Sequence, residues 1–127
     1  MKEVIISIKP KYALAIIKGE KRIEFRKRKP NIKAGTRCYI YATAPYKMII
    51  GYLIYWGCII RRKDQLWKEV QSIAGITKEE FDAYYKNKEL AYGWIFSAYK
   101  AKEPFPIEVF DLKRPPQSYQ FINNIHY

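Results

Sequence analysis

Alternating apolar and polar residues along much of this chain predict a protein built mainly from β-strands. Arg37–Thr43 alternates strictly, with Cys38, Ile40 and Ala42 on one side and tyrosines and a threonine on the other. Lys47–Ile60 is a longer run of β-forming residues. We expect strands at Val4–Ile8, Lys21–Lys27, Arg37–Thr43, Lys47–Ile60, Leu90–Tyr99 and Phe105–Leu112, and a further short segment at Phe121–Ile125.

Helical spacing of apolar residues replaces the alternation in three places. The first helix follows the first strand, begins at Pro10 and ends at Gly19, a residue suited to a left-handed stop. A second helix is expected to have Asp64 as its N-terminal cap. The third begins at Thr77, which forms with Glu80 the sequence pattern of a capping box.

These elements predict an α+β fold, mostly β, in a single domain over residues 1–127. The count is about five or six strands and about three helices. Gly51 and Gly57 interrupt the longest run and predict a curved or bulged strand. Strong curvature is what a small barrel requires. We therefore expect a small, mixed, partly closed β-barrel with helices packed at its ends.

The most highly charged stretch is Gly19–Pro30, which contains six basic residues and two acids. Ile23 and Phe25 lie two residues apart, so a strand here would turn one face to the core and a densely charged face outward. Glu24 lies among the cations. It is either a structural counter-ion of the neighbouring arginines or part of a site.

The positive charge of the chain is unevenly distributed. The net charge is +12, and residues 1–40 supply +9 of it with 12 Lys/Arg against 3 Asp/Glu. Such clustering predicts a polyanionic partner, of which nucleic acid is the commonest. A soluble basic protein without such a partner is the alternative that composition leaves open.

The composition argues against several classes of function. No apolar run is long enough to span a bilayer and the first residues lack a secretory pattern, so we expect a cytoplasmic protein with no membrane partner. The one histidine and two cysteines lack metal-ligand spacing, and no glycine-rich phosphate loop is present. We therefore expect no metal and no cofactor. An enzyme of this sequence would have to use Lys, Glu, Tyr, Ser or Thr.

Three segments carry a resemblance to a known family. They are Ser7–Tyr12, Ile17–Arg26 and Ile40–Thr43, and the second contains a Gly-x-Lys-x-x-Glu-x-Arg pattern directly after the first expected helix. In this order the segments resemble the ASCH domain family, a branch of the PUA-like barrels. The tail Pro115–Tyr119 is similar to that of a stand-alone subgroup. The resemblance covers nearly the whole chain and implies a PUA-like barrel.

The resemblance implies a function linked to RNA. PUA-like barrels commonly bind RNA in a cleft beside the barrel, and a role in RNA-linked regulation has been proposed for ASCH domains. Some members are hydrolases that remove acetyl groups from N4-acetylcytidine, and some are ribonucleases. The lysine of the amidohydrolase members matches Lys21, but their threonine matches Glu24 and their glutamate has no clear equivalent. The sequence therefore departs from the amidohydrolase pattern at Glu24.

Lys21 and Glu24 are the candidate catalytic residues if the protein is an enzyme, with Tyr92 as a third candidate. Lys21 would be a desolvated amine, and Glu24 would activate water or accept hydrogen bonds from the edge of a base. Their alternative roles are a solvated or phosphate-binding lysine and an ion-paired glutamate. Strict alternation places the two on opposite faces, so a shared site requires a bulge or a strand that begins after Lys21.

The candidate RNA-binding residues are basic, aromatic or small polar side chains around the same cleft. Basic residues would contact phosphates, tyrosines would stack on bases, and small polar groups would lie at the mouth of the cleft. Their alternative roles are solvated charge, core packing and turn formation. The set comprises Lys9, Arg22, Arg26, Lys27, Arg28, Lys29, Lys33, Tyr41, Thr43, Tyr92, Gln117 and Ser118.

Three functions are consistent with these residues. The first is a module that binds single-stranded or structured RNA, or a modified nucleotide within it, with DNA also open. The second is a hydrolase that uses the same cleft, either an N4-acetylcytidine amidohydrolase or a ribonuclease. The third is a module that docks an acidic protein by charge alone.

Overall fold

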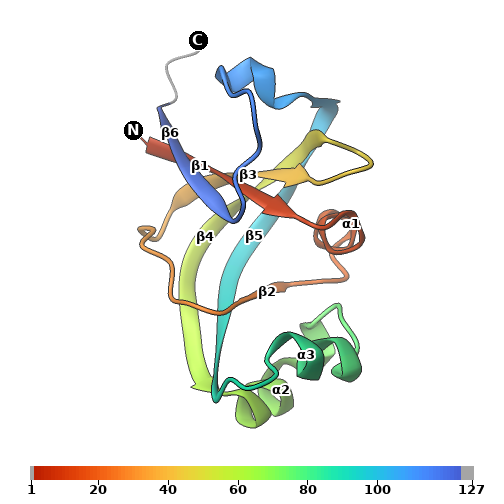
Figure 1. Cartoon of the computed structure of the whole chain (residues 1–127), viewed down its shortest axis with the longest axis vertical. Helices are drawn as coiled ribbons and strands as arrows, with labels where there is room; N and C mark the ends of the chain where they lie inside the picture. The colour runs from red at the N-terminus through yellow and green to blue at the C-terminus, as the bar shows by residue number, and fades with distance from the viewer. Residues whose placement is uncertain (1, 124–127) are drawn as a thin grey trace.

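Within residues 2–123, six strands form one mixed sheet in the order β2–β5–β4–β3–β1–β6 (Figure 1). The structure is a computed structural model that describes residues 2–123. β1 and β3 are parallel, and the other neighbouring pairs are antiparallel. The strands are β1 (Lys2–Ile8), β2 (Ile23–Arg26), β3 (Thr36–Ala42), β4 (Met48–Arg62), β5 (Leu90–Phe105) and β6 (Tyr119–Asn123).

The two longest strands, β4 and β5, bend along their length and give the sheet a barrel-like curvature (Figure 1). Their pairing register shifts between Ile49 and Gly51 and again between Tyr55 and Gly57. Such bulges bend a strand and increase its twist. The predicted curved or bulged strand over Lys47–Ile60 is therefore confirmed. The fold is α+β and mostly β, as predicted, although within residues 2–123 no hydrogen-bonded pairing joins β2 to β6 and closes the sheet.

In the part of the chain that the structure describes, three α-helices pack on this sheet. α1 ends as predicted at Gly19, which has a left-handed φ of 81°, and α3 has the predicted capping box between Thr77 and Glu80. The prediction for α2 is wrong at its start, because Arg62 is the N-cap and Asp64 lies inside the first turn, where a negative charge favours the helix dipole. No helix within residues 2–123 is long and apolar enough to cross a membrane. The helices are α1 (Pro10–Lys18), α2 (Lys63–Val70) and α3 (Lys78–Tyr84).

Three groups of buried side chains stabilise the fold. The first lies between α1 and one face of the sheet and includes Trp94. The second joins β2 to the helices at the far ends of β4 and β5, and Phe25 and Phe81 meet in it at 5.0 Å between ring centres. The third lies on the opposite face of β1 and β3, where a short 3₁₀ helix, η2 (Ile107–Phe110), covers Tyr41.

β2 is shorter than the strand predicted over Lys21–Lys27. The N–H groups of Glu20 and Lys21 both donate to the Ala15 carbonyl oxygen at the end of α1, at 2.9 and 3.1 Å. The chain is therefore still leaving the helix where the strand was expected to begin. Because β2 begins at Ile23, the side chain of Lys21 does not follow the alternation of the strand.

The last third of the chain also differs from the prediction. Leu90–Tyr99 and Phe105–Leu112 were expected to be separate strands, but β5 is continuous to Phe105 and is followed by η2. Pro106 has no N–H to donate to the ladder, which explains why the strand stops there. β6 takes up most of the predicted Phe121–Ile125 segment, and the remainder lies outside the described residues.

The segment between α2 and α3 packs directly onto Lys21 through Gly75. Gly75 has a left-handed φ of 65°, and a Cβ placed there would lie 2.3 Å from the Cβ and 2.8 Å from the Cα of Lys21. The Arg22 N–H also donates to the Ile73 carbonyl oxygen at 2.9 Å. Both the backbone conformation and the close approach require glycine at this position.

We predict that Gly75→Ala destabilises the protein more than the matched change Gly19→Ala. Both glycines have a left-handed φ, so each alanine introduces about 1 kcal/mol of backbone strain. A Cβ at Gly19 meets no atom within 4 Å, whereas a Cβ at Gly75 displaces Lys21. We expect an extra loss of roughly 2 kcal/mol in the free energy of unfolding, measured with urea. Equal losses of unfolding free energy in the two variants would show that the segment between α2 and α3 moves away from Lys21 without cost.

Candidate functional site

A cavity of about 690 Å³ lies beside β2, between α1 and α3. The end of β1, the start of α1, β2, the residue after β3, α3 and the segment before β6 all contribute to its lining. Its volume falls in the usual range of small-molecule sites, about 300–1,000 Å³. Its polar lining includes Ser7, Tyr12, Lys21, Glu24, Thr43 and Glu80.

Lys21 is almost completely buried in the wall of this cavity, with 2% of its side chain exposed. Its Nζ donates a hydrogen bond to the Ala74 carbonyl oxygen at 2.8 Å and lies 4.7 Å from the centre of the Phe25 ring. Burial lowers the pKa of Lys21 to about 8, although the Glu24 carboxylate opposes the shift. The amine is therefore mostly protonated at neutral pH, yet close enough to its pKa to exchange a proton.

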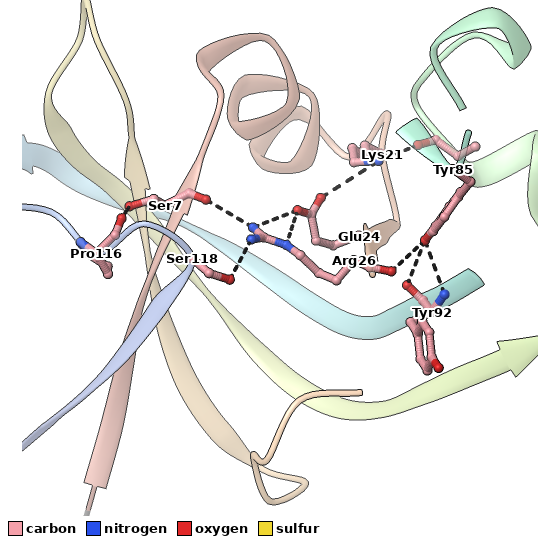
Figure 2. A network of polar contacts seen from close by, with 9 residues as sticks. Ser7, Lys21, Glu24, Arg26, Tyr85, Tyr92, Pro116 and Ser118 are labelled. Atoms are coloured by element: carbon pink, nitrogen blue, oxygen red, sulfur yellow. Dashed lines mark hydrogen bonds and ion pairs between the residues drawn. The ribbon is translucent and has the colours of Figure 1, made fainter. Parts of the chain in front are cut away.

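Buried Glu24 forms an ion pair with the partly buried Arg26 next to Lys21 (Figure 2). Nε and Nη2 of Arg26 each lie 2.9 Å from Glu24 Oε2, while Glu24 Oε1 lies 4.0 Å from Lys21 Nζ. The Glu24 side chain is 8% exposed, so the prediction of a fully charged outward face is wrong at this position. Glu24 is both a counter-ion of Arg26 and part of the cavity lining. With Lys21 protonated, the three side chains leave a positive charge that favours an anion.

The segment before β6 is fixed to the cavity by Ser7 and Arg26 (Figure 2). Ser7 Oγ donates to the Pro116 carbonyl oxygen at 2.6 Å, and the Ser7 N–H donates to the Ser118 carbonyl oxygen at 2.9 Å. Arg26 donates to Ser118 Oγ at 3.2 Å and to the Ser7 carbonyl oxygen at 3.1 Å. Ser118 therefore holds Arg26 in place, whereas Gln117 lines the cavity as expected.

Tyr12 and Glu80 connect α1 to α3 along the cavity wall. Tyr12 Oη and Lys11 Nζ both donate to Glu80 Oε2. Burial and the contact with Glu80 raise the pKa of Tyr12 to about 12, and hydrogen bonds from the Thr77 backbone, Tyr12 and Lys11 lower the pKa of Glu80 to about 2. The sequence predicts Tyr12 within the first helix and Glu80 in the capping box of the third. The capping box uses only Oε1, but no sequence signal shows that Tyr12 reaches the other oxygen.

Both tyrosines predicted as site residues, Tyr41 and Tyr92, lie outside the cavity lining. Tyr41 is buried under η2, so its ring offers no face for a base to stack on. The ring of Tyr92 points away from Lys21 (Figure 2), and the Tyr92 N–H donates to Tyr85 Oη at 3.2 Å. Tyr85 Oη in turn donates to the Arg26 carbonyl oxygen at 2.7 Å. The sequence could not place these two rings relative to the cavity, because alternation along a strand does not reveal which other element covers each face.

The predicted basic residues fall into two groups. Lys9 and Arg26 line the cavity, as does the predicted Thr43. Lys27 Nζ lies 4.6 Å from the centre of the ring of Tyr84, which is also a lining residue. The second group is exposed and lies outside the lining, and its contacts with RNA stay a prediction. It consists of Arg22, Arg28, Lys29 and Lys33. Ser7, Tyr12, Glu80 and Tyr84 are lining residues that sequence reasoning missed.

The fold and the cavity define a small α+β protein with a pocket beside a curved mixed sheet, to which Lys9, Lys21 and Arg26 bring positive charge. The family model of the ASCH domain matches residues 6–110. The chain therefore belongs to the ASCH family, and the resemblance seen in its three segments is confirmed.

Two relatives and one solved protein show how far the similarity extends. The ASCH domain-containing ribonuclease of Zymomonas mobilis is 30% identical over 121 residues, which cover 92% of this chain and 82% of that protein. The large ribosomal subunit protein uL22 of Ureaplasma parvum is 28% identical over 94% of this chain, but the match spans only 39% of that protein. A crystal structure of ASCH from Zymomonas mobilis superposes with a TM-score of 0.88 at 28% identity, covering 96% of this chain and 88% of that chain.

We predict that the protein gains stability relative to Lys21→Met as the pH rises above about 8. The pKa of Lys21 falls from 10.5 to about 8 on folding, so between these values the unfolded chain binds a proton that the folded chain does not. Raising the pH therefore favours the folded state. We expect a relative gain of about 2 kcal/mol between roughly pH 7.5 and 9.5, measured by urea unfolding. Parallel pH profiles of the two proteins would show that the amine is solvated.

Proposed function

We propose that this ASCH protein binds RNA through its basic segments and hydrolyses it in the cavity, with Lys21 as the group that transfers the proton. The observation that carries the proposal is a buried amine, with its pKa lowered to about 8, in the wall of a cavity large enough for a nucleotide. The relative from Zymomonas mobilis, which is similar over most of both chains, is named a ribonuclease.

The distribution of charge supports RNA as the substrate. Residues 1–40 hold most of the net charge, and they also supply much of the cavity wall, including Lys9 and Lys21. The exposed side chains of Arg28, Lys29 and Lys33 follow the connection that leads from β2 to β3. Contacts of such residues with phosphates hold a strand in place without reading its sequence.

The neutral amine of Lys21 is suited to accept the proton of an attacking ribose hydroxyl. In this step the 2′ oxygen bonds to phosphorus, its proton passes to the amine, and the bond between phosphorus and the 5′ oxygen breaks. The ammonium then returns the proton to the leaving 5′ oxygen, which gives a cyclic phosphate and a free 5′-hydroxyl. Lys9 offers positive charge to the phosphate, whereas Arg26 already contacts Glu24, Ser7 and Ser118.

RNA binding without hydrolysis is the second candidate function, and the position of Glu24 favours it. Glu24 Oε2 accepts the hydrogen bonds of Arg26, whereas Oε1 lies 4.0 Å from Lys21 Nζ. Oε1 can therefore accept a hydrogen bond from the exocyclic amine of cytosine or from a guanine edge. Removal of an acetyl group from N4-acetylcytidine has less support, because Glu24 stands where the amidohydrolase pattern has threonine.

We predict that the protein cleaves single-stranded RNA and that Lys21→Met lowers the rate at least about 100-fold. The control Lys68→Met changes an exposed lysine on α2 and leaves the rate unchanged. The rate should rise with pH and level off above about 8, and Lys21→Arg should not restore it, because arginine stays protonated. End-labelled RNA on a denaturing gel measures cleavage, with a 2′-deoxy substrate alongside.

Each other result of this experiment points to a different function. Tight binding of RNA that stays intact would show that the protein binds RNA without hydrolysing it. In that case Glu24→Gln should change the preference for particular bases but not the affinity for phosphates. Cleavage of the 2′-deoxy substrate would exclude the ribose hydroxyl as the attacking group. Acetate released from N4-acetylcytidine would instead support an amidohydrolase.

We predict that RNA affinity falls steeply with salt and that changing Arg28, Lys29 and Lys33 together to Gln weakens this dependence. Each lost contact with a single-stranded phosphate reduces the log–log slope by about 0.7, so the triple variant should lose about 2. Fluorescence anisotropy at several salt concentrations measures the slope. The control triple variant changes the exposed lysines Lys68, Lys86 and Lys88 to Gln. An equal reduction of the slope in the control would show that the overall charge of the protein, and not this connection, attracts RNA.

A further inference from the structure

A row of tyrosines crosses the face of the sheet opposite α1. Tyr39 on β3, Tyr52 on β4 and Tyr99 on β5 lie directly opposite one another in the strand register. The rings of Tyr52 and Tyr99 stack with their centres 5.0 Å apart. Two residues before Tyr99, Ser97 lies on the same face and accepts a hydrogen bond from Trp56 Nε1 at 2.9 Å. We call these five side chains the outer platform.

Trp56 and Tyr99 are the exposed rings of the outer platform, whereas Tyr39 packs against Phe110 of η2 with the ring centres 4.7 Å apart. The residues that alternate with it, Cys38, Leu53 and Ala98, pack in the core cluster that includes α1, so the platform must face the other way. Trp56 is 52% exposed and Tyr99 is 47% exposed. Two large rings that are half in solvent on neighbouring strands form a surface on which flat groups can stack.

Positive charge lies beside the outer platform and indicates what the platform binds. The Arg37 guanidinium lies 4.3 Å from the centre of the Tyr52 ring. The basic connection from β2 to β3 also ends at the platform, because a Cβ built on Gly35 would lie 4.0 Å from the Trp56 ring, and the exposed Lys33 lies two residues earlier. A surface that combines stacking rings with cations is complementary to a single-stranded nucleic acid.

The acidic groups near the outer platform offset part of this charge, because Glu3 pairs with Arg37, while the basic connection still contributes Lys33. Glu3 is buried, and its Oε2 lies 3.7 Å from Arg37 Nε. A hollow of about 310 Å³ beside Tyr52 is lined by one further acid, Glu103, together with Lys102. A second copy of this chain is a poor occupant, because its own net charge of +12 would repel the cations around the platform.

We propose that the outer platform is a second RNA-binding surface, on which two bases of one strand stack on Trp56 and Tyr99. Trp56 is hydrogen-bonded to Ser97, which lies two residues before Tyr99 on β5. Two residues of a strand span about 7 Å, so the rings of Trp56 and Tyr99 are separated by about this distance along β5. Sheet surfaces in other RNA-binding folds stack two or three bases on aromatic side chains in this way. The inference rests on the proposed RNA-directed function but uses none of the residues that line the cavity.

The connection from β2 to β3 supplies the path between the two sites. It begins after Arg26, beside the cavity, and ends next to Trp56, and it carries the exposed Arg28, Lys29 and Lys33. Phosphates bound along this connection would bring the strand from one site to the other. An RNA of a few nucleotides would therefore occupy only one site, and a longer RNA would bind both.

Tryptophan fluorescence tests the outer platform directly, because Trp56 is the most exposed of the three tryptophans. The probe is a 12-nucleotide 2′-O-methyl oligouridine, which the proposed reaction cannot cleave. We expect RNA to quench the tryptophan fluorescence of the wild type and of Trp67→Phe. This quenching should be lost in Trp56→Phe, because phenylalanine keeps a ring that can stack on a base but removes the fluorescent indole. Quenching that persists in Trp56→Phe would overturn the proposal.

Affinity and cleavage measurements separate the outer platform from the cavity. Trp56→Ala and Tyr99→Ala should each weaken binding of the 12-mer about tenfold, while both leave cleavage of a dinucleotide unchanged. The control Phe121→Ala removes an exposed ring from β6 and should leave affinity unchanged. Urea midpoints show that each variant is folded.

The outcomes distinguish failure of this inference from failure of the proposed function. Binding and cleavage that do not depend on Trp56 or Tyr99 would overturn the outer platform and leave the hydrolase intact. Platform-dependent binding by a protein that does not cleave RNA would support the platform and overturn the hydrolase. A wild type that binds no RNA would overturn both.

Discussion

The burial of one lysine amine is the constraint on which the rest of this site depends. Lys21 loses most of its hydration, and a charged amine in that position is tolerated only with nearby partners. The Ala74 carbonyl oxygen, the Glu24 carboxylate and the face of the Phe25 ring supply them. These partners come from β2 and from the segment that follows α2, so the amine is in its observed environment only when these two segments have folded together. The lowered pKa of Lys21 is thus a property of the tertiary structure.

The helices between β4 and β5 make this environment possible. Ala74 and Gly75 follow the 3₁₀ turn after α2, and they can lie against Lys21 because Gly75 lacks a side chain. α3 then returns to α1 through Glu80, whose two oxygens bind the Thr77 N–H and the Tyr12 hydroxyl. One carboxylate therefore both begins a helix and closes the cavity wall. A change that weakens α3 would loosen the site as well as the fold.

Local patterns in the sequence predicted most of the fold and only part of the site. The glycine stop of α1, the capping box of α3 and the bulged β4 each depend on a few neighbouring residues, and all three are confirmed. Lys21 and Glu24 could be selected because they lie close together in an unusual charged segment. The roles of Tyr12 and Tyr41 could not be predicted, because each depends on an element distant in sequence. α3 gives Tyr12 its partner, and η2 covers Tyr41.

The clustering of charge in the first third of the chain acquires a physical reason from the fold. The segment of the chain that contains Lys21 and Arg26 continues directly into the connection that ends beside Trp56. A single strand of RNA that follows this connection would meet the same short segment of the protein throughout. Cations on the far helices would then contribute little to binding, because screening limits their reach to about 10 Å at 0.1 M salt. Selection for RNA contact would therefore concentrate positive charge before β3, where the sequence has it.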